Sequence, residues 1–284
     1  MIQYLYLGRI AYDAALWLQE ELVELRREER IGNVLLLLEH PPVLTLGRHA
    51  NRANVLASDE LLASRGVTLH QINRGGDVTY HGPGQLVGYP IFDLRSLDGP
   101  SGGRMGPVDF VRDMEEILIR LCGVYGVRAG RIAGLTGVWV HAQGDTSDTS
   151  ARKIGAIGIH VSRGITSHGF AFNVTTDLRD FGLINPCGIT DKAVTSLERE
   201  TADPAGLPGL EVIAGLAARQ FGNVFKRPML AVESVDALRA EACAESTPAA
   251  SDRLQRNFPA EDTPLQFPED IEDLRGAGSR FDRA

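Results

Sequence analysis

Residues 152–160 read Arg152-Lys153-Ile154-Gly155-Ala156-Ile157-Gly158-Ile159-His160. The apolar run predicts a strand over 154–161, and a second apolar stretch at 138–141 predicts its hairpin partner across a polar loop at 143–150. Further strands are predicted at 86–92 and 169–174. Because several strands follow one another without helices between them, regular βαβ winding is disfavoured. We therefore expect an α/β chain of the α+β type, built on a mixed β-sheet with flanking helices.

The flanking helices are predicted from apolar spacing and from signals at their ends. Apolar residues recur at helical spacing over 9–30, where acidic residues precede basic ones as the helix dipole favours. Pro107 suits the first position of a helix over 108–125, and Ser58 can cap a short helix that ends at 63. A last helix is predicted over 210–225. The remaining predicted strands are 2–7, 34–38, 43–46 and 67–72.

The composition changes after Arg227. Residues from about 240 onward are rich in Ala, Ser, Pro and charged side chains and contain few large apolar groups. Such a segment buries too little apolar surface to order itself. We predict one α/β domain over residues 1–227 and a largely disordered C-terminal extension over 228–284.

The bulk composition excludes several classes of protein. The chain has 284 residues, 43% of them hydrophobic, and a formal net charge of −8, so no basic face for a nucleic acid is indicated. Three scattered cysteines make neither a disulfide framework nor a zinc motif, which fits a reducing compartment. The N-terminus lacks a signal peptide, and the longest apolar run, 34–38, is far too short for a membrane span. We expect a soluble, cytoplasmic protein with no membrane partner.

The segment 74–85 is unusually rich in glycine and in hydrogen-bonding side chains. It reads Arg74-Gly75-Gly76-Asp77-Val78-Thr79-Tyr80-His81-Gly82-Pro83-Gly84-Gln85. Four glycines in so short a span indicate backbone conformations or close approaches that a Cβ would block. The pattern is neither a nucleoside triphosphate P-loop nor a dinucleotide fingerprint, because the segment that follows it reads as a strand. It is either an elaborate turn or part of a binding site.

Lys153 opens the apolar strand at 154–161. It is either a surface lysine at a strand end or a partly buried ammonium whose lowered pKa lets it exchange protons near neutrality. The small residues Gly155, Ala156 and Gly158 would leave room for a flat or elongated ligand beside this strand.

Cys187 lies between Pro186 and Gly188 in a predicted loop, where reactive groups are often presented. Cys122 differs because its neighbours are those of an apolar helix, and for Cys243 we expect no role. Thiols react as thiolates, so a nearby cation such as Lys153 would activate Cys187. A buried, unreactive cysteine is the alternative.

The histidines offer a further possibility. His81, His160 and His168 could bind zinc together with Cys187, although their spacing matches no standard zinc motif. We expect His168 to line a pocket or to orient a loop. Phe170 and Phe172 alternate with small residues, which predicts one core face and one ligand-facing face for their strand.

Five ordered motifs carry a family resemblance. They are Arg-Gly-Gly-x-x-Thr-Tyr-His-Gly-Pro-Gly-Gln at 74–85, Gly-Val-Trp-Val at 137–140, Arg-Lys-Ile-x-Ala-Ile-Gly at 152–158, His-Gly-Phe-Ala-x-Asn at 168–173 and Asn-Pro-Cys-Gly at 185–188. Over residues 3–226 the chain resembles the octanoyl-ACP:protein N-octanoyltransferases, also called lipoyl(octanoyl) transferases or the lipoate–protein ligase B family. The resemblance implies the mixed-sheet catalytic domain that lipoate ligases and biotin protein ligases share.

The resemblance also implies a reaction and its residues. An octanoyl group would pass from octanoyl-acyl carrier protein to a lysine of a lipoyl domain, in 2-oxoacid dehydrogenase complexes or the glycine cleavage H protein, without a cofactor. Cys187 matches the acyl-thioester nucleophile, and Lys153 matches the lysine that lowers its pKa and exchanges protons. The positions that match substrate contacts are Arg74, Gly75, Gly76, Asp77, Val78, Thr79, Tyr80, His81, Ala156, Ile157, Gly158, Gly169, Phe170 and Ala171.

Other readings of the same residues remain open. An ATP-dependent lipoate–protein ligase would share the fold and form an acyl-adenylate, without needing Cys187. An amidotransferase that moves octanoyl groups between lipoyl domains would share the thioester. A catalytically silent binder of acyl carrier protein or lipoyl domains, or a zinc-binding structural module, would need no nucleophile.

Overall fold

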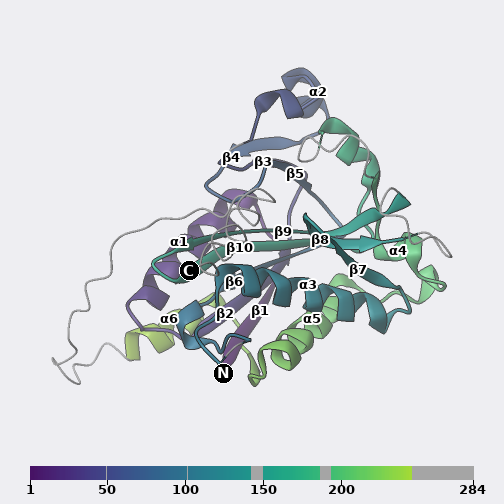
Figure 1. Ribbon diagram of the computed structural model, residues 1–284. Helices are drawn as coiled ribbons and strands as arrows, with labels where there is room; N and C mark the ends of the chain where they lie inside the picture. The colour runs from purple at the N-terminus through teal and green to yellow at the C-terminus, as the bar shows by residue number, and fades with distance from the viewer. Residues whose placement is uncertain (49, 101, 142–149, 186–192, 245–284) are drawn as a thin grey trace, which may run out of the picture.

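The computed structural model describes residues 1–244 apart from 49, 101, 142–149 and 186–192 (Figure 1). The strands are β1 (Ile2–Arg9), β2 (Asn33–Glu39), β3 (Val43–Leu46), β4 (Thr68–Gln71), β5 (Val78–His81), β6 (Gln85–Ile91), β7 (Ala129–Ile132), β8 (Leu135–Val140), β9 (Arg152–Ser162), β10 (Ile165–Asn173), β11 (Ala193–Val194) and β12 (Met229–Ala231). Within the described range they form a larger sheet in the order β12-β1-β2-β6-β10-β9-β8-β7, with β11 beside β9, and a smaller sheet in the order β4-β3-β5.

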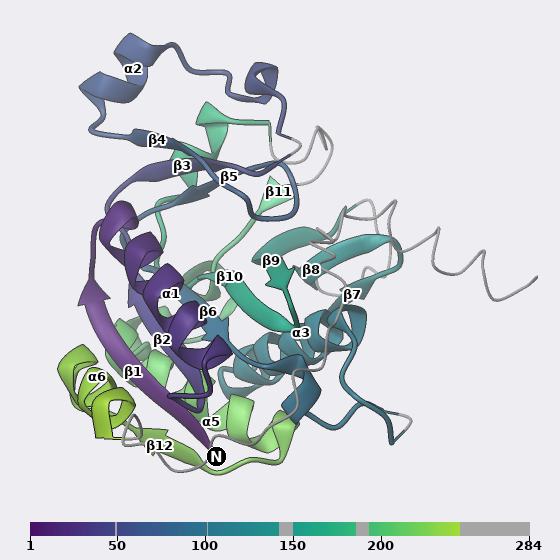
Figure 2. The same ribbon diagram turned by 90° about the vertical axis from the view of Figure 1, so that its left-hand side faces the viewer.

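Helices cover both faces of the larger sheet (Figure 2). The α-helices of the described chain are α1 (Tyr12–Arg27), α2 (Asp59–Ser64), α3 (Pro107–Val124), α4 (Leu197–Glu200), α5 (Leu210–Phe225) and α6 (Val235–Ala244), of which α2 packs against the smaller sheet. α3 and α5 enclose the main core on one face, and α1 and α6 enclose a second core on the other. The smaller sheet lies over one end of the larger one, near β9 and β10 (Figures 1 and 2).

The prediction of a mixed sheet is confirmed. β1 runs parallel to β2 and to β12, whereas β6, β10, β9, β8 and β7 pair successively in antiparallel fashion. The predicted hairpin is also present, because Val138 on β8 lies opposite Gly155 on β9. An additional hairpin joins β9 to β10 through Arg163 and Gly164, whose φ angles of 51° and 84° are those of a tight two-residue turn.

The helix predicted over 9–30 is shorter at both ends. Arg9 still belongs to β1, so α1 begins only at Tyr12. At the other end Glu29 adopts a left-handed conformation with φ 58°, and the N–H of Arg30 donates to the carbonyl of Leu25. This bond satisfies a terminal carbonyl and ends the helix. The predicted cap is confirmed at Ser58, whose hydroxyl accepts from the N–H of Leu61, and Pro107 is the first residue of α3, as predicted.

The glycine-rich segment contains a strand that its sequence did not predict. β5 pairs antiparallel with β3, placing Tyr80 opposite Leu44, and Val78 and Tyr80 are buried in the core of the smaller sheet. The alternation of Val78 and Tyr80 was the available signal, but the surrounding glycines and Pro83 favoured a turn.

The expected disorder of the C-terminal extension does not hold for residues 229–244. β12 adds a parallel strand to the edge of β1, and α6 follows it. Leu238 and Ala242 of α6 are buried in the core beneath α1, and Arg239 forms an ion pair with Glu21 of α1 at 2.7 Å. The rest of the extension, 245–284, lies outside the described residues, so the division into domains stays a prediction.

Alanine substitutions at two glycines should change the free energy of unfolding in opposite directions. A Cβ on Gly88 in β6 would lie 2.1 Å from the ring of Phe170, so Gly88→Ala should lower the free energy of unfolding by about 1–3 kcal/mol through overpacking. Gly215 is exposed within α5 with nothing within 4 Å, so Gly215→Ala should raise it by about 0.5–1 kcal/mol. Urea unfolding followed by circular dichroism measures both. Equal effects of the two substitutions would contradict this packing.

Candidate functional site

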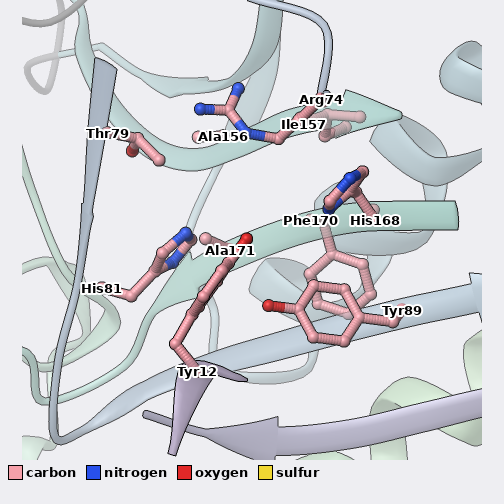
Figure 3. A pocket seen from close by; sticks show the side chains of 12 residues that line it. Tyr12, Arg74, Thr79, His81, Tyr89, Ala156, Ile157, His168, Phe170 and Ala171 are labelled. Atoms are coloured by element: carbon pink, nitrogen blue, oxygen red, sulfur yellow. The ribbon is translucent and has the colours of Figure 1, made fainter. Parts of the chain in front are cut away.

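A pocket lies where β9 and β10 pass beneath the smaller sheet (Figure 3). Residues 156–158 of β9 and 168–171 of β10 line it, and Tyr12, Arg74, Thr79, His81 and Tyr89 complete its wall. Its volume is about 30 Å³, roughly that of one water molecule in the liquid. A longer ligand would enter it only if lining side chains move.

The pocket brings together three segments that are distant in the sequence. Every predicted contact on β9 (156–158) and on β10 (169–171) lines it, as do Arg74, Thr79 and His81. β9 and β10 pair in a register that sets Gly158 opposite Gly169 and Ile157 opposite Phe170. Antiparallel pairing thus joins these two segments, and the smaller sheet supplies the third.

The other predicted contacts in segment 74–81 do not line the pocket. Val78 and Tyr80 pack in the core of the smaller sheet, where the Tyr80 hydroxyl donates to Asp180 at 2.9 Å. Gly75 donates its N–H to the carbonyl of Ile159 at 3.3 Å, which attaches the loop to β9. The carboxylate of Asp77 accepts from the N–H of Val78 and from the side chain of Asn54. These residues shape the loop that carries the lining side chains.

At Gly76 the backbone of the loop lies very close to the backbone of Gly47. A Cβ on Gly47 would lie 2.0 Å from the carbonyl oxygen of Gly76, and Gly76 itself has a φ of 86°. The loop therefore packs backbone against backbone at this point, where a side chain has no room.

Arg74 braces its own loop as well as lining the pocket. Its guanidinium donates to the carbonyl of Gly75 at 2.6 Å and to that of Asp77 at 2.9 Å. The side chain lies over Gly158, where a Cβ would come within 2.9 Å of Nη1. The space that the small residue Gly158 leaves beside β9 is therefore filled by Arg74.

The prediction that Gly155 leaves room for a ligand is wrong. A Cβ on Gly155 would meet Leu118 of α3 at 2.9 Å, on the core face of the sheet. Phe170 and Phe172 belong to this core as well, and the ring of Phe170 stacks on Phe221 of α5 with centroids 6.0 Å apart. Ala171 joins the core on the opposite face, beneath α1.

Tyr12 and Tyr89 are pocket residues that the sequence did not reveal. Figure 3 draws the ring of Tyr12 between those of His81 and Tyr89. Tyr12 opens an amphipathic helix and Tyr89 lies in an apolar strand, so both carry the signal of core residues only. His168 does line the pocket, as predicted, and its Nε2 lies 2.8 Å from Oδ1 of Asn73.

Burial keeps the histidines and Tyr12 in and around this pocket uncharged. It lowers the pKa of His40 to about 4 and those of His81 and His168 to about 3. It also raises the pKa of Tyr12 to about 12. An imidazolium would lose its hydration here, and for a Tyr12 phenolate the loss of hydration outweighs the attraction of Arg74, so each group stays neutral near pH 7.

Lys153 is held at the end of β9 by its neighbours on β8. Its ammonium lies 4.5 Å from the ring centroid of Trp139, a cation–π contact. Gly137 beneath it has a φ of 120° and donates its N–H to the buried carboxylate of Glu115 at 3.0 Å. A Cβ on Gly137 would lie 3.4 Å from Cε of Lys153 and 2.6 Å from the carbonyl oxygen of Gly155. Lys153 does not line the pocket as described.

The three cysteines differ in their surroundings. Cys187 lies in 186–192, outside the described residues, so its role and its distance from Lys153 stay predictions. Cys122 is fully buried in α3, and burial raises the pKa of its thiol to about 12. It therefore remains a thiol near neutrality. Cys243 is exposed on α6.

Within the described part of the chain, no three His, Cys, Asp or Glu side chains form a group that could hold a metal ion. His160 lies apart from His81, in a separate groove of about 650 Å³ along α1. None of the described helices is both long and apolar enough to cross a membrane.

The family model of the lipoyl protein ligase A/B catalytic domain matches residues 11–213. Solved structures agree on the fold. A bipartite lipoate protein ligase from Thermoplasma acidophilum superposes with a TM-score of 0.62 at 16% identity, covering 86% of this chain and 91% of that one. A lipoate-protein ligase A bound with ATP gives a TM-score of 0.60 at 16% identity, covering 86% and 94%. The fold is that of a lipoyl protein ligase A/B catalytic domain.

Curated relatives narrow the assignment. An octanoyltransferase from Acidobacterium capsulatum is 60% identical over 82% of this chain and 94% of its own length. One from Koribacter versatilis is 52% identical over 84% and 90%. The chain therefore belongs to the octanoyltransferase family, and it is an acyltransferase.

The buried histidines should make stability depend on pH. Their pKa values are lowered in the folded state, so the unfolded chain binds more protons below its histidine pKa of about 6.5. From about pH 7.5 to about pH 5.5 the free energy of unfolding should fall by about 1.4 kcal/mol for each of His40, His81 and His168, or roughly 4 kcal/mol together. Urea titrations at both pH values test this. His168→Gln should remove about a third of the decrease, and a flat profile would refute the neutral cluster.

Because we expect Lys153 to exchange protons in the reaction, Gly137→Ala should impair catalysis. The added Cβ meets the carbonyl of Gly155 and the stem of Lys153, and the φ of 120° is unfavourable for alanine. A displacement near 1 Å can cost on the order of 100-fold in rate, so we expect at least a tenfold loss of octanoyl transfer. Gly130→Ala in β7, where nothing lies within 4 Å, is the control and should keep its activity. Equal activity of the two variants would contradict this role of Gly137.

Proposed function

We propose that this acyltransferase moves an octanoyl group from octanoyl-acyl carrier protein to a lysine of a lipoyl domain, through a thioester on Cys187. The proposed acceptors are the lipoyl domains of 2-oxoacid dehydrogenase complexes and the glycine cleavage H protein. Octanoyl transfer in protein lipoylation agrees with the family and the fold. The cytoplasm is the proposed compartment.

The observation that carries the proposal is the shared pocket. Three segments selected from the sequence for acyl-substrate contact, on the glycine-rich loop, β9 and β10, line one cavity. Ala156, Ile157 and Phe170 give it an apolar wall suited to an acyl chain. Each buried methylene contributes about 0.8 kcal/mol, so the depth of an opened slot would set the preferred chain length.

The path of the chain supports a pairing of Cys187 with Lys153. The segment that carries Cys187 follows Asn185, whose N–H donates to the carbonyl of Asn54 at 2.7 Å. It ends at β11, where Val194 lies opposite Lys153 in parallel register. The described strand that follows the Cys187 segment in the chain therefore lies beside the lysine that would activate the thiol.

The chemistry follows from a thiolate and a proton acceptor. Lys153 stabilises the Cys187 thiolate or accepts its proton, and the thiolate attacks the thioester carbonyl of the donor. The C–S bond to the phosphopantetheine arm breaks as the new C–S bond forms, in a nearly balanced exchange, and the departing pantetheine thiolate takes the proton from Lys153. Lys153 is then a neutral amine. The neutral amine of the acceptor lysine then attacks the acyl-enzyme, an amide forms, and the cysteine sulfur leaves. Lys153 takes the proton that the amine loses.

An ATP-dependent ligase is the principal alternative on this fold. The similar lipoate-protein ligase A is bound with ATP, and the fold alone does not separate the two chemistries. A ligase would label the acceptor with free octanoate and ATP and would tolerate loss of Cys187.

Incubation with octanoyl-acyl carrier protein in the absence of ATP, followed by intact mass spectrometry, tests the proposal. We expect one octanoyl adduct that hydroxylamine removes, because hydroxylamine cleaves thioesters. The adduct should be absent from Cys187→Ala and present in the matched variant Cys243→Ala, which removes the exposed thiol on α6.

Other results would point elsewhere. An adduct only from an octanoylated lipoyl domain would indicate an amidotransferase. Labelling that requires ATP would indicate a ligase, and an adduct that survives Cys187→Ala would refute the nucleophile.

A further inference from the structure

Two of the sequence motifs end in a residue with a buried side-chain amide that takes no part in the proposed reaction. Gln85 closes the glycine-rich motif and is 1% exposed, and Asn173 closes β10 and is 5% exposed. They lie opposite each other in the register of β6 and β10. A buried amide needs hydrogen-bond partners, so their partners indicate what they do.

The two amides form a relay that leads from the pocket toward β11. Nδ1 of His81 lies 2.7 Å from Oε1 of Gln85. Nε2 of Gln85 donates to Oδ1 of Asn173 at 2.9 Å and to the carbonyl of Tyr80 at 3.2 Å. Nδ2 of Asn173 donates to the carbonyl of Thr195 at 2.9 Å.

Backbone carbonyls fix the direction of every bond in this relay. A carbonyl only accepts, so the groups that face Tyr80 and Thr195 must be the NH₂ groups of Gln85 and Asn173. The oxygen of Gln85 therefore faces His81 and also only accepts. Nδ1 of His81 must then carry the proton. In a neutral ring this leaves Nε2 with a lone pair.

The surroundings of His81 keep its ring neutral. Burial lowers its pKa to about 3, and His40, Arg74 and His168 act in the same direction, opposed by the bond to Gln85. Tyr12, which stacks on His81 with ring centroids 6.3 Å apart, is a neutral phenol whose pKa is raised by burial. Nε2 makes no hydrogen bond to any other residue that the structure describes.

The far end of the relay reaches the strand of Lys153. Thr195 accepts from Asn173 through its carbonyl and donates its N–H to the carbonyl of Lys153 at 2.9 Å. Its hydroxyl donates to Glu200 at 2.5 Å, and Glu200 also binds Arg152 at 2.9 Å. Gln85, Asn173 and Thr195 therefore connect the pocket histidine with the backbone of the proposed catalytic lysine.

We propose that Gln85 and Asn173 are positioning residues that hold His81 as the Nδ1–H tautomer, so that Nε2 accepts an N–H group of the substrate in the pocket. This inference rests on the proposed function, in which two groups could supply that N–H. One is the amine of the acceptor lysine, and the other is an amide of the phosphopantetheine arm. Nε2 orients either group but keeps no proton, because so weak a base remains neutral.

Nitrogen-15 NMR of histidine-labelled protein tests the tautomer without any reaction. At neutral pH we expect the pattern of a neutral Nδ1–H ring for His81, assigned by its loss in His81→Gln, and no titration down to about pH 5. In Gln85→Met the proton should distribute over both nitrogens. An Nε2–H ring or an imidazolium in the wild-type protein would overturn the proposal.

A second variant, Gln85→Glu, introduces a negative charge beside Nδ1 of His81. In Gln85→Glu a carboxylate accepts from Nδ1–H and favours the imidazolium, so the pKa of His81 should rise. As the pH falls through the raised pKa, Nε2 becomes a donor and transfer should decline, in addition to the decline that protonation of the Cys187 thiolate causes in the wild-type enzyme. Asn33→Asp, a buried amide-to-carboxylate change on β2, is the matched control and should keep the wild-type profile. The same profile in Gln85→Glu as in wild type would overturn the role of Gln85.

Measuring the rates of the two half-reactions separately identifies which substrate group donates its N–H to Nε2 of His81. Loss of one hydrogen bond corresponds to about a tenfold rate decrease, which we expect for Gln85→Met in one half-reaction. A decrease in acyl-enzyme formation from octanoyl-acyl carrier protein assigns the pantetheine amide, and a decrease in transfer to a lipoyl domain assigns the lysine amine. No decrease in either would refute a role in substrate positioning. If no acyl-enzyme forms at all, the proposed function fails, while the tautomer measurement still stands.

The variant Asn173→Asp tests the Lys153 end of the relay separately from the His81 end. Gln85 remains anchored by Tyr80, so His81 should keep its tautomer, whereas the carbonyl of Thr195 loses its donor. We expect kcat to fall with KM little changed, because Lys153 shifts while the pocket does not. Loss of the His81 tautomer in this variant would show that Tyr80 does not hold Gln85.

Discussion

The pairing of β10 with β6 on one side and β9 on the other is the constraint on which the rest of the structure depends. Phe170 lies opposite Gly88, and Gly169 lies opposite Gly158. A Cβ on Gly169 would meet the carbonyl of Gly88 at 2.1 Å, so the strands approach at a distance that only glycine permits. This close pairing sends Phe170 into the core and leaves the opposite face free for the loop of Arg74.

The polar wall that results is rich in hydrogen bonds and poor in charge. His40 donates through Nδ1 to the carbonyl of Ile10, so its Nε2 accepts from the hydroxyl of Tyr89 at 2.8 Å. His81 is held in the same way by Gln85. Burial keeps both rings neutral, so among the described residues that line the pocket formal charge is carried by Arg74, and Lys153 carries a charge at the end of β9. In the proposed mechanism, such a site orients neutral groups and confines proton transfer to Lys153.

Sequence patterns predicted the elements whose causes are local. The hairpin of β8 and β9, the cap at Ser58 and the start of α3 at Pro107 each follow from residues within a few positions. β5 escaped prediction because its partner, β3, lies far upstream and its own neighbours are glycines. α6 escaped because two buried residues, Leu238 and Ala242, give a short amphipathic signal in a polar segment.

The sequence by itself determined the mixed sheet, the family resemblance and the segments that meet at the pocket, because apolar alternation and ordered motifs are properties of neighbouring residues. Only the tertiary structure decided that Gly155 faces the core, that Arg74 fills the space above Gly158 and that Tyr12 joins the site. It also decided which nitrogen of His81 carries the proton. That choice depends on the carbonyls of Tyr80 and Thr195, and folding brings these groups together over more than a hundred positions of sequence.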